Sequence, residues 1–215
     1  MFRVPESSLR LLDPVRGKAV LELGCGAARW SIALAQRGAR PVGLDLSTQQ
    51  LARARELRSR ARLRFPLVRA SAERLPFRDR SFDTVFCDWG AMTFANPRRT
   101  VPECARVLRR GGALVFSAAN PFRWLAHHPR VDRMTRRLHR PYFGEERIDW
   151  GPDDTVEFQL TYADWVTLFR ANGFAIDRLI EYRPRAGQRS TYLSRSDRRW
   201  ARSWPVETIW KLRKG

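Results

Sequence analysis

The sequence predicts an α/β fold built on a doubly wound, mostly parallel sheet. Two observations carry this prediction. Short apolar runs alternate with amphipathic stretches over the first half of the chain, as in βαβ units of about 30 residues. The chain has 215 residues, of which 43% are hydrophobic, and a single core can serve up to about 250 residues. We therefore expect residues 1–215 to form one globular domain.

The first five strands are expected where short apolar runs end in turn residues. The run KAVLELG is followed by a cysteine and a second glycine, and the run RPVGLDL is followed by a serine. The five runs lie at residues 18–24, 40–46, 64–70, 81–88 and 113–119. Apolar residues at helical spacing between them predict helices at 29–38, 47–61 and 97–112.

The alternation stops after the fifth strand. Residues 119–160 are rich in Trp, His, Pro and Arg and show no clear periodicity. A helix is expected at 162–173, because Gly173 follows its last apolar position, as at many helix C-termini. A strand at 174–182 and a last strand near 206–214 complete the pattern. We therefore expect residues 119–160 to be an insertion that begins at the carboxyl edge of the sheet.

Composition excludes several classes of protein and of site. No run approaches the ~18 apolar residues of a membrane span, and the start MFRVPESSLRLLDP lacks the features of a signal peptide. The three cysteines, Cys25, Cys87 and Cys104, form no CxxC pair, which argues against a zinc site and against a disulfide framework. We expect a cytoplasmic protein with no membrane partner and no metal.

The formal net charge of +19 raises nucleic acid as a partner, because Lys and Arg drive binding to phosphates. The distribution of the charge favours another interpretation. The arginines are scattered through helices, as in ARARELRSRARLR, where they resemble solvated helix faces. We therefore prefer a basic surface without a nucleic-acid role and keep RNA as the second partner class.

The loop Gly24-Cys25-Gly26 follows the first strand and precedes a helix, so a ligand can approach its backbone closely. A dinucleotide site would have a third glycine where this chain has Arg29. The second strand ends at Asp45, whose carboxylate can accept hydrogen bonds from both hydroxyls of a ribose. Together these features predict a site for a nucleoside without a phosphate clamp, and not for NAD.

A wider set of motifs resembles a known family. The stretches ELGCG, GLDLS, SAERLPF, SFDTV and VLRRGGAL, in this order and spacing, resemble the class I S-adenosylmethionine-dependent methyltransferases over residues 18–118. The chain looks most like the bacterial small-molecule enzymes of the methyltransferase type 11 kind. The resemblance implies a Rossmann-like seven-stranded sheet with an antiparallel last strand and helices on both faces. It also implies S-adenosyl-L-methionine as the cofactor.

The resemblance also assigns roles to residues in the loops after the first two strands. Gly24 and Gly26, with Cys25 between them, would face the amino-acid part of the cofactor, and Glu22 would lie near its ammonium group. Asp45 would hold the ribose hydroxyls. In addition, Leu46 would pack on the adenine.

Later strand ends supply the remaining contacts that the resemblance implies. Ala72 would offer its backbone N–H to the adenine ring, while Ser71 stands where the family usually has Asp, so Glu73 could replace that contact. Cys87 and Asp88, with Trp89 after them, would line the channel where the methyl group meets its acceptor. The chain departs from the family in having only about 17 residues before the first strand, so we expect the lid to come from elsewhere or the start to be truncated.

Candidates for acceptor chemistry are few. A base is useful for an acceptor that must lose a proton, and the weak candidates are His127, His128 and Asp88; His139 lies in the same insertion. The alternative is that the histidines are solvated loop residues. Aromatic residues could form an apolar acceptor pocket or the insertion's own small core; they are Trp89, Phe94, Phe122, Trp124, Tyr142, Phe143 and Trp150.

Three function classes follow. The first is methyl transfer to an O, N or C atom of a small-molecule acceptor, and the second is methylation of RNA or protein. The third is a protein that binds S-adenosylmethionine without methyl transfer. Amino-methylating nucleic-acid enzymes tend to carry Asn or Asp followed by Pro-Pro and an aromatic, whereas this chain has CDWG after the fourth strand. Small-molecule methylation is therefore the preferred function, and no sequence feature points to a particular oligomeric state.

Overall fold

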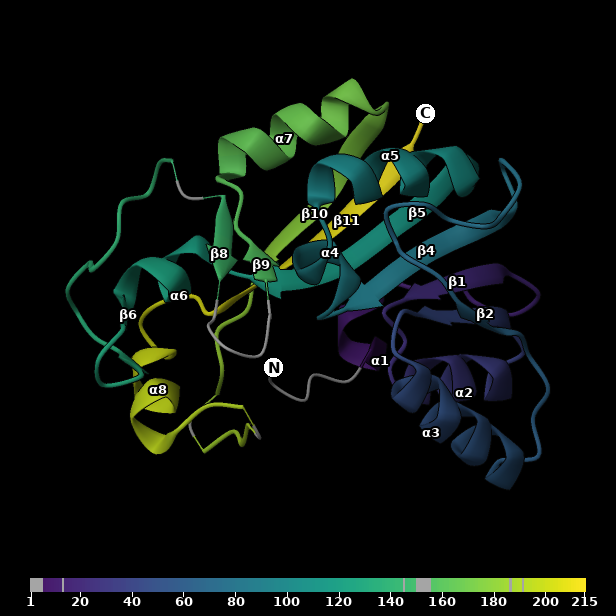
Figure 1. Ribbon diagram of the computed structural model, residues 1–215, viewed down its shortest axis with the longest axis horizontal. Helices are drawn as coiled ribbons and strands as arrows, with labels where there is room; N and C mark the ends of the chain where they lie inside the picture. Colours follow the sequence, from purple (N-terminus) through teal and green to yellow (C-terminus); the bar gives the residue numbers. More distant parts are fainter. Residues whose placement is uncertain (1–5, 13, 145, 150–155, 186, 191) are drawn as a thin grey trace.

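The centre of the molecule is a twisted seven-stranded sheet with helices on both faces (Figure 1). Its strand order is β10-β11-β5-β4-β1-β2-β3, so the order reverses between β1 and β4. The computed structural model describes residues 6–12, 14–144, 146–149, 156–185, 187–190 and 192–215.

Five neighbouring strands of the sheet are parallel, and one strand runs against the others. β1 pairs in parallel with β2 and β4, β2 with β3, and β4 with β5. β11 pairs antiparallel with both β5 and β10. The predicted fold, including the antiparallel last strand, is thereby confirmed. The strands are β1 (Ala19–Leu23), β2 (Arg40–Asp45), β3 (Leu67–Arg69), β4 (Phe82–Asp88), β5 (Leu108–Ala119), β10 (Phe174–Glu181) and β11 (Glu207–Lys214).

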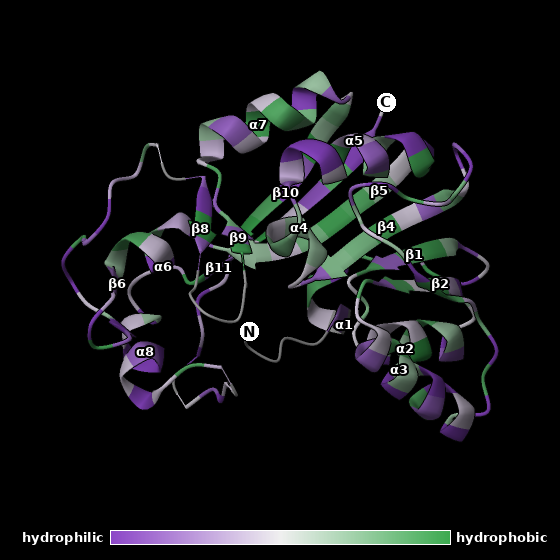
Figure 2. Ribbon diagram, in the orientation of Figure 1, coloured by the Kyte–Doolittle hydropathy of each residue, from purple (hydrophilic) through white to green (hydrophobic). Residues whose placement is uncertain are grey.

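Each face of the sheet has its own apolar core, because alternate residues of a strand point to opposite faces. Leu21 and Leu23 of β1 pack with α4, α5 and α7, whereas Val20 packs with α2 and the segment after α1. Figure 2 shows the apolar residues concentrated in the central strands. The helices that cover the sheet are α1 (Glu6–Leu9), α2 (Arg29–Gln36), α3 (Thr48–Arg60), α4 (Ala91–Phe94), α5 (Pro97–Val107) and α7 (Tyr162–Ala171).

The helix predicted at 97–112 is too long, and this is a correction to the sequence analysis. α5 ends at Val107, and β5 begins at Leu108, which pairs with Phe82 of β4. Arg109 then forms an ion pair with Asp83 at 2.7 Å. The pairing with β4 therefore overrides the local helical pattern of this segment, and the glycines after it lie inside a strand.

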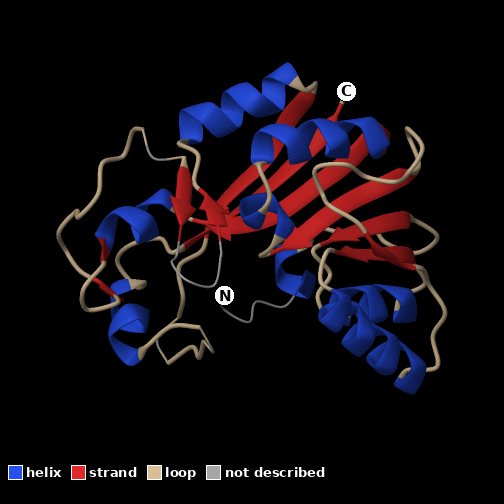
Figure 3. Ribbon diagram, viewed as in Figure 1, coloured by secondary structure: helices blue, strands red, loops and turns tan. Residues whose placement is uncertain are grey.

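Two segments of the chain after β5 form a separate lobe beside the sheet, at the left of Figure 1. This lobe, which we define as α6, β6, β7 and α8, joins the predicted insertion to a second segment after β10. Ala126 and Met134 pack there with Leu193, Trp200 and Val206 in one small core. The elements of the lobe are short (Figure 3); they are α6 (Pro121–Ala126), β6 (His127–His128), β7 (Arg133–Met134) and α8 (Arg195–Trp200). Outside the lobe, β8 (Arg147–Asp149) and β9 (Val156–Phe158) form a two-stranded antiparallel pair that follows β7 in the chain.

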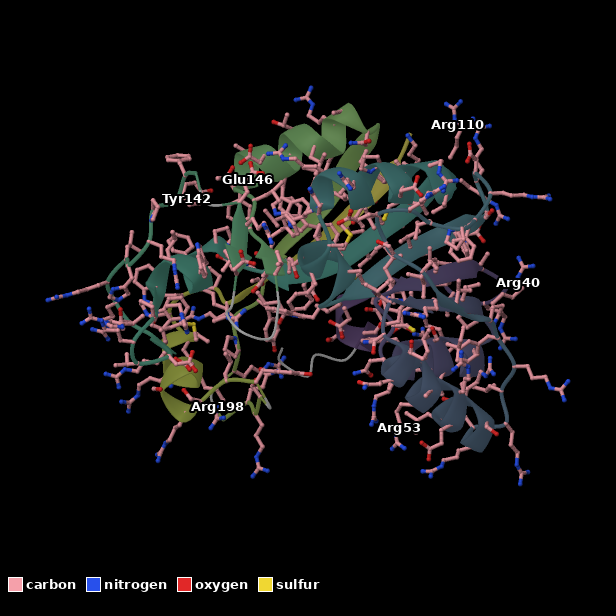
Figure 4. The ribbon with its side chains drawn as sticks, in the orientation of Figure 1. Arg40, Arg53, Arg110, Tyr142, Glu146 and Arg198 are labelled. Carbon is pink, nitrogen blue, oxygen red and sulfur yellow. The ribbon has the colours of Figure 1, made fainter. Side chains whose placement is uncertain are left out.

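The arginines lie at many edges of the molecule. In Figure 4, Arg40 and Arg110 lie at one end of the sheet, Arg53 lies on α3 and Arg198 lies on α8. All three cysteines are buried and free. Within the part of the chain that the structure describes, no helix has the length and apolar character needed to cross a membrane.

Candidate cofactor and acceptor site

The loop after β1 has the backbone geometry that its glycines permit. Gly24 and Gly26 have φ values of +63° and +51°, in the left-handed region that favours glycine. A Cβ atom on Gly24 would lie 2.9 Å from the backbone nitrogen of Ala91, because the start of α4 packs directly against the loop. Glycine at position 24 is therefore required both by its backbone angle and by the close approach of α4.

The carboxylate of Asp45 is fixed at the end of β2 by two backbone N–H groups. Gly26 donates to Oδ2 at 2.7 Å, and Ser47 donates to Oδ1 at 2.8 Å. Ser47 also caps α3, since its hydroxyl accepts a hydrogen bond from Gln50 N at 3.2 Å. The glycine loop and the end of the second strand are thus joined through the side chain of Asp45.

A cavity of about 370 Å³ opens between these loops. Its volume lies within the range of about 300–1,000 Å³ that is typical of small-molecule sites. Eight of its lining residues are among the predicted contacts or acceptor-pocket aromatics: Gly24, Gly26, Asp45, Leu46, Ser71, Ala72, Trp89 and Phe94. Six others were not predicted, namely Leu44, Gln50, Ala70, Gly90, Ala91 and Ala95.

The cavity wall suits a nucleoside in its chemistry. Asp45 and Gln50 supply polar groups, whereas Leu46 and Phe94 are large apolar side chains that are 65% and 49% exposed. Exposed apolar groups at the mouth of a cavity gain stability when a flat ring covers them. The residues present therefore fit the ribose and the adenine of S-adenosylmethionine.

Glu22 lies beneath the first turn of α2. Its side chain is buried, and Oε2 accepts hydrogen bonds from the backbone N–H of Ser31, at 2.8 Å, and from the Ser31 hydroxyl. Burial raises the pKa of Glu22 to about 7, although the bonds from Ser31 oppose this shift. The structure thus places Glu22 against α2, outside the lining of the cavity.

Asp88 is held in a hydrogen-bond network at the end of β4. Its Oδ2 accepts from Trp30 Nε1 at 2.8 Å, and its Oδ1 accepts from the Ser117 hydroxyl at 3.0 Å. The next residue, Trp89, has φ of +52° and donates from its backbone N–H to Ser117 and from Nε1 to Glu207, at 3.1 Å and 2.8 Å. The network orients Trp89 at the cavity wall and occupies both oxygens of Asp88.

Three other predicted contacts point away from the cavity. Cys25 and Cys87 are buried in apolar cores, and burial raises the pKa of the Cys87 thiol to about 12. Glu73 turns toward α5, where Oε1 accepts from Asn96 N at 2.8 Å and Oε2 lies 3.4 Å from Arg99. The residues that line the cavity directly after β3 are therefore Ala70, Ser71 and Ala72.

The histidines lie in or beside the lobe, and none lines the cavity between Gly24 and Ala95. His127 Nε2 is 2.9 Å from Asp132 Oδ1, and the rings of His128 and His139 are 4.5 Å apart. The pKa of His139 is lowered, first by desolvation and then by His128 and the neighbouring arginines. These positions favour a structural role for the histidines over contact with a methyl acceptor.

The predicted aromatic residues divide between the cavity and the region of the lobe. Trp89 and Phe94 line the cavity, whereas Trp124 is buried with Leu125 and Ile148 in a small core beneath Arg140. The remaining aromatics pair outside the cavity: Phe122 with Trp204, and Tyr142 with Phe143. Trp150 lies outside the described residues.

Comparison with known proteins agrees with this geometry. A sequence model of the family described as a methyltransferase domain matches residues 21–116. A demethylmenaquinone methyltransferase of Clavibacter sepedonicus is 38% identical over 111 residues, which cover 51% of this chain and 44% of that protein. A ubiquinone biosynthesis O-methyltransferase of Idiomarina loihiensis is 36% identical over 112 residues, with coverage of 50% and 45%. The chain thus spans less than half the length of these curated relatives.

The structural comparison extends over the whole chain. An S-adenosylmethionine dependent methyltransferase from Mesorhizobium loti superposes with a TM-score of 0.79 at 26% identity, covering 97% of this chain and 96% of that one. Fold and site together define a Rossmann-like protein with a cavity at the carboxyl edge of its sheet. Residues 21–116 thus match the methyltransferase-domain family, and the chain has the fold of the class I S-adenosylmethionine-dependent methyltransferases, whose cofactor is S-adenosylmethionine.

Proposed function

We propose that this chain transfers a methyl group from S-adenosylmethionine to an O, N or C atom of a small-molecule acceptor. The observation that carries the proposal is the Asp45 carboxylate, which is fixed by Gly26 and Ser47 at the wall of the cavity. The names of the two quinone-pathway relatives support a small acceptor. The proposal places the chain in the cytoplasm, where its three free thiols stay reduced.

The residues of the cavity have separate roles in this proposal. Gly24 and Gly26 let the backbone approach the cofactor, Asp45 holds the ribose, and Leu46 covers the adenine. When bound, S-adenosylmethionine supplies an electrophilic methyl group on a sulfonium. Trp89 then positions the acceptor, since it follows the end of β4 and lines the cavity.

Positioning, and not proton removal, is the main contribution that we assign to the described residues. Neither Asp88 nor any of the described histidines lies in the cavity lining. Holding two reactants in line contributes several kcal/mol, up to about 7–11, to lowering a barrier. The proposal therefore requires an acceptor atom that is nucleophilic without a dedicated base from these residues.

Calorimetry tests the cofactor assignment. We expect S-adenosylmethionine and S-adenosylhomocysteine to bind and NAD to bind at least tenfold more weakly. Asp45→Ala removes a charge-assisted contact and should weaken S-adenosylhomocysteine by about 1.5–3 kcal/mol. Asp149→Ala, a change of an exposed aspartate in β8, is the matched control and should have no effect. Equal binding of NAD, or an unchanged affinity of the Asp45 variant, would contradict the proposal.

RNA methylation is the second candidate, and the charge of +19 is the observation that favours it. The labelled arginines of Figure 4 lie at one end of the sheet, on α3 and on α8 and not in one patch, which supports weak, nonspecific binding. Affinity for RNA should therefore fall steeply with salt and be negligible at physiological ionic strength. Tight binding at that salt, with methyl groups transferred to a defined RNA site, would make RNA the acceptor.

A further inference from the structure

Arg123 lies beside the acceptor side of the cavity. It belongs to α6, which begins directly after β5 and so starts at the same sheet edge as the cavity loops. Its guanidinium lies over the ring of Trp89, 5.4 Å from the ring centroid. Because Trp89 lines the cofactor cavity, Arg123 is one side chain away from the position where methyl transfer is proposed.

The guanidinium of Arg123 is partly buried and, apart from its contact with the Trp89 ring, has no partner among the residues that the structure describes. Within the described ranges of the chain, no hydrogen bond or ion pair joins it to another group, and its backbone N–H alone donates, to Asn120 O. An arginine has five N–H donors, and removing them from water without acceptors is unfavourable. Desolvation accordingly lowers the pKa of Arg123.

Three buried carboxylates face Arg123 without forming an ion pair with it. They are Glu157 of β9, Asp197 of α8 and Glu207 of β11, which attract the guanidinium from beyond the 4.0 Å of an ion pair. Glu207 instead accepts the hydrogen bond from Trp89 Nε1. Since β9 also packs against α4, which lines the cavity, these charges lie beside the elements that form the cofactor cavity.

The charges around Arg123 indicate which kind of ligand its guanidinium can bind. A planar carboxylate matches the fork of a guanidinium and can form two parallel hydrogen bonds with it. The carboxylates of Glu157, Asp197 and Glu207 would repel a dianionic phosphate more strongly than a ligand with one negative charge. A single negative charge on a flat group therefore fits best.

We propose that Arg123 binds a carboxylate of the methyl acceptor and thereby determines which small molecules are methylated. The inference rests on the proposed function, because it names a feature of the acceptor of that same site. Arg123 is a specificity-determining residue that holds one end of the acceptor, while Trp89 lies between it and the cofactor cavity.

Benzoate and benzamide are the probes, since they have nearly the same shape and differ in charge. Their binding is measured by calorimetry with and without saturating S-adenosylhomocysteine. We expect benzoate to bind the wild-type protein at least tenfold more tightly than benzamide. Arg123→Gln should abolish this preference, and Arg123→Lys, which keeps the charge but loses the fork, should retain only part of it. Arg130→Gln removes the same charge from an exposed position near β6 and should retain the full preference.

The outcomes separate this inference from the proposed function. Equal binding of benzoate and benzamide to the wild-type protein, or a preference that survives in Arg123→Gln, overturns the role of Arg123. Failure of S-adenosylhomocysteine to bind overturns the proposed function, and the measurements without cofactor still decide the role of Arg123.

Thermal unfolding excludes a purely structural role. Because Arg123 has no ion-pair partner among the described residues, Arg123→Gln should unfold within about 2 °C of Arg130→Gln. A markedly lower Tm together with an intact benzoate preference would show that Arg123 serves packing, and would overturn the proposal.

Discussion

The cofactor edge and the lobe are built by different means. The cofactor edge consists of loops at the ends of β1, β2, β3 and β4, and backbone groups fix its key side chain, Asp45. The lobe depends on side-chain contacts between two segments far apart in the chain, such as Met134 with Trp200. Small loops on a rigid sheet can hold a constant ligand, whereas a separately packed lobe can change its contacts without moving that ligand.

This difference indicates which of the two regions tolerates amino-acid substitutions. The loop after β1 approaches the start of α4 closely where Gly24 meets the backbone of Ala91, so a side chain added at Gly24 disturbs two elements at once. In the lobe, the Trp200 indole donates to Thr135 O at 2.6 Å and fills a core that is separate from the sheet. We therefore expect changes in the lobe to affect its own packing first.

The largest effect is expected from Trp200→Ala, which tests whether the two regions are independent. Removing a buried Trp costs about 3–5 kcal/mol, and here it also leaves Thr135 O without its donor. We expect the lobe to open, detected as faster proteolysis after the arginines near α8, while S-adenosylhomocysteine affinity stays within about threefold, or ~0.7 kcal/mol. Loss of cofactor binding in a protein whose sheet stays folded would show that the lobe is part of the cofactor site.

A second prediction concerns the buried carboxyl of the cofactor edge. The folded pKa of Glu22, about 7, lies above the ordinary value of 4.5, so the protonated form is favoured in the folded state. Its contribution to stability is therefore full below about pH 4.5 and is lost as pH rises to about 7, a change of about 3 kcal/mol.

Glu22→Gln should remove this pH dependence, because an amide can still accept from Ser31 but does not titrate. Urea unfolding of both proteins at pH 5 and pH 8 measures the effect. We expect the variant to gain stability relative to the wild type at pH 8. An equal difference between the two proteins at both pH values would contradict the burial of an ionisable group at this position.

A third experiment compares two glycines that share a left-handed backbone. Gly24 has φ of +63° and a close neighbour in Ala91, whereas Gly111 has φ of +74° and no atom near its missing Cβ. Alanine at either position costs about 1–2 kcal/mol for the backbone, but at Gly24 overpacking should add about 1–3 kcal/mol. Urea midpoints give both values, and equal losses would mean that α4 moves away from the loop freely.

The smallest effect is expected from Leu46→Ala. Leu46 is 65% exposed, so its removal should leave the free energy of unfolding nearly unchanged. Loss of an apolar contact with adenine should nevertheless weaken S-adenosylhomocysteine by about 1 kcal/mol. Leu179→Ala is the control, because Leu179 is 46% exposed on β10, away from the cavity. Equal affinities of the two variants would contradict the placement of the adenine.

The sheet could be predicted from sequence because its signals are local. Short apolar runs such as AVLEL, separated by helical segments, indicate buried strands. The ends of the first two strands then determine the positions of Gly24 and Asp45. The prediction failed where pairing with another strand outweighs local pattern, as at Leu108 opposite Phe82. The helix α8 was also not predicted from sequence. The apolar residues Leu193 and Trp200 are buried only because Met134, from a distant segment, packs against them.

The site was predictable to the extent that backbone geometry determines it. Glycines and an aspartate at strand ends mark the ribose side of the cavity, so Gly26 and Asp45 could be found without a structure. Small residues such as Ala70 and Ala95 carry no chemical signal, and they line the cavity only because the loops converge there. Arg123 was one arginine among many in the sequence, and only its position over Trp89 distinguishes it.

The place of β11 in the sheet has a consequence for how the chain folds. β11 lies between β5 and β10, and its pairing of Glu207 with Ala119 joins segments that are far apart in sequence. Closing so long a loop is entropically slow, so this contact should form late during folding. Until then β5 presents an unpaired, largely apolar edge, which is a template for pairing with another molecule. The yield of refolding should therefore fall as protein concentration rises, and the loss should stop once β11 has docked.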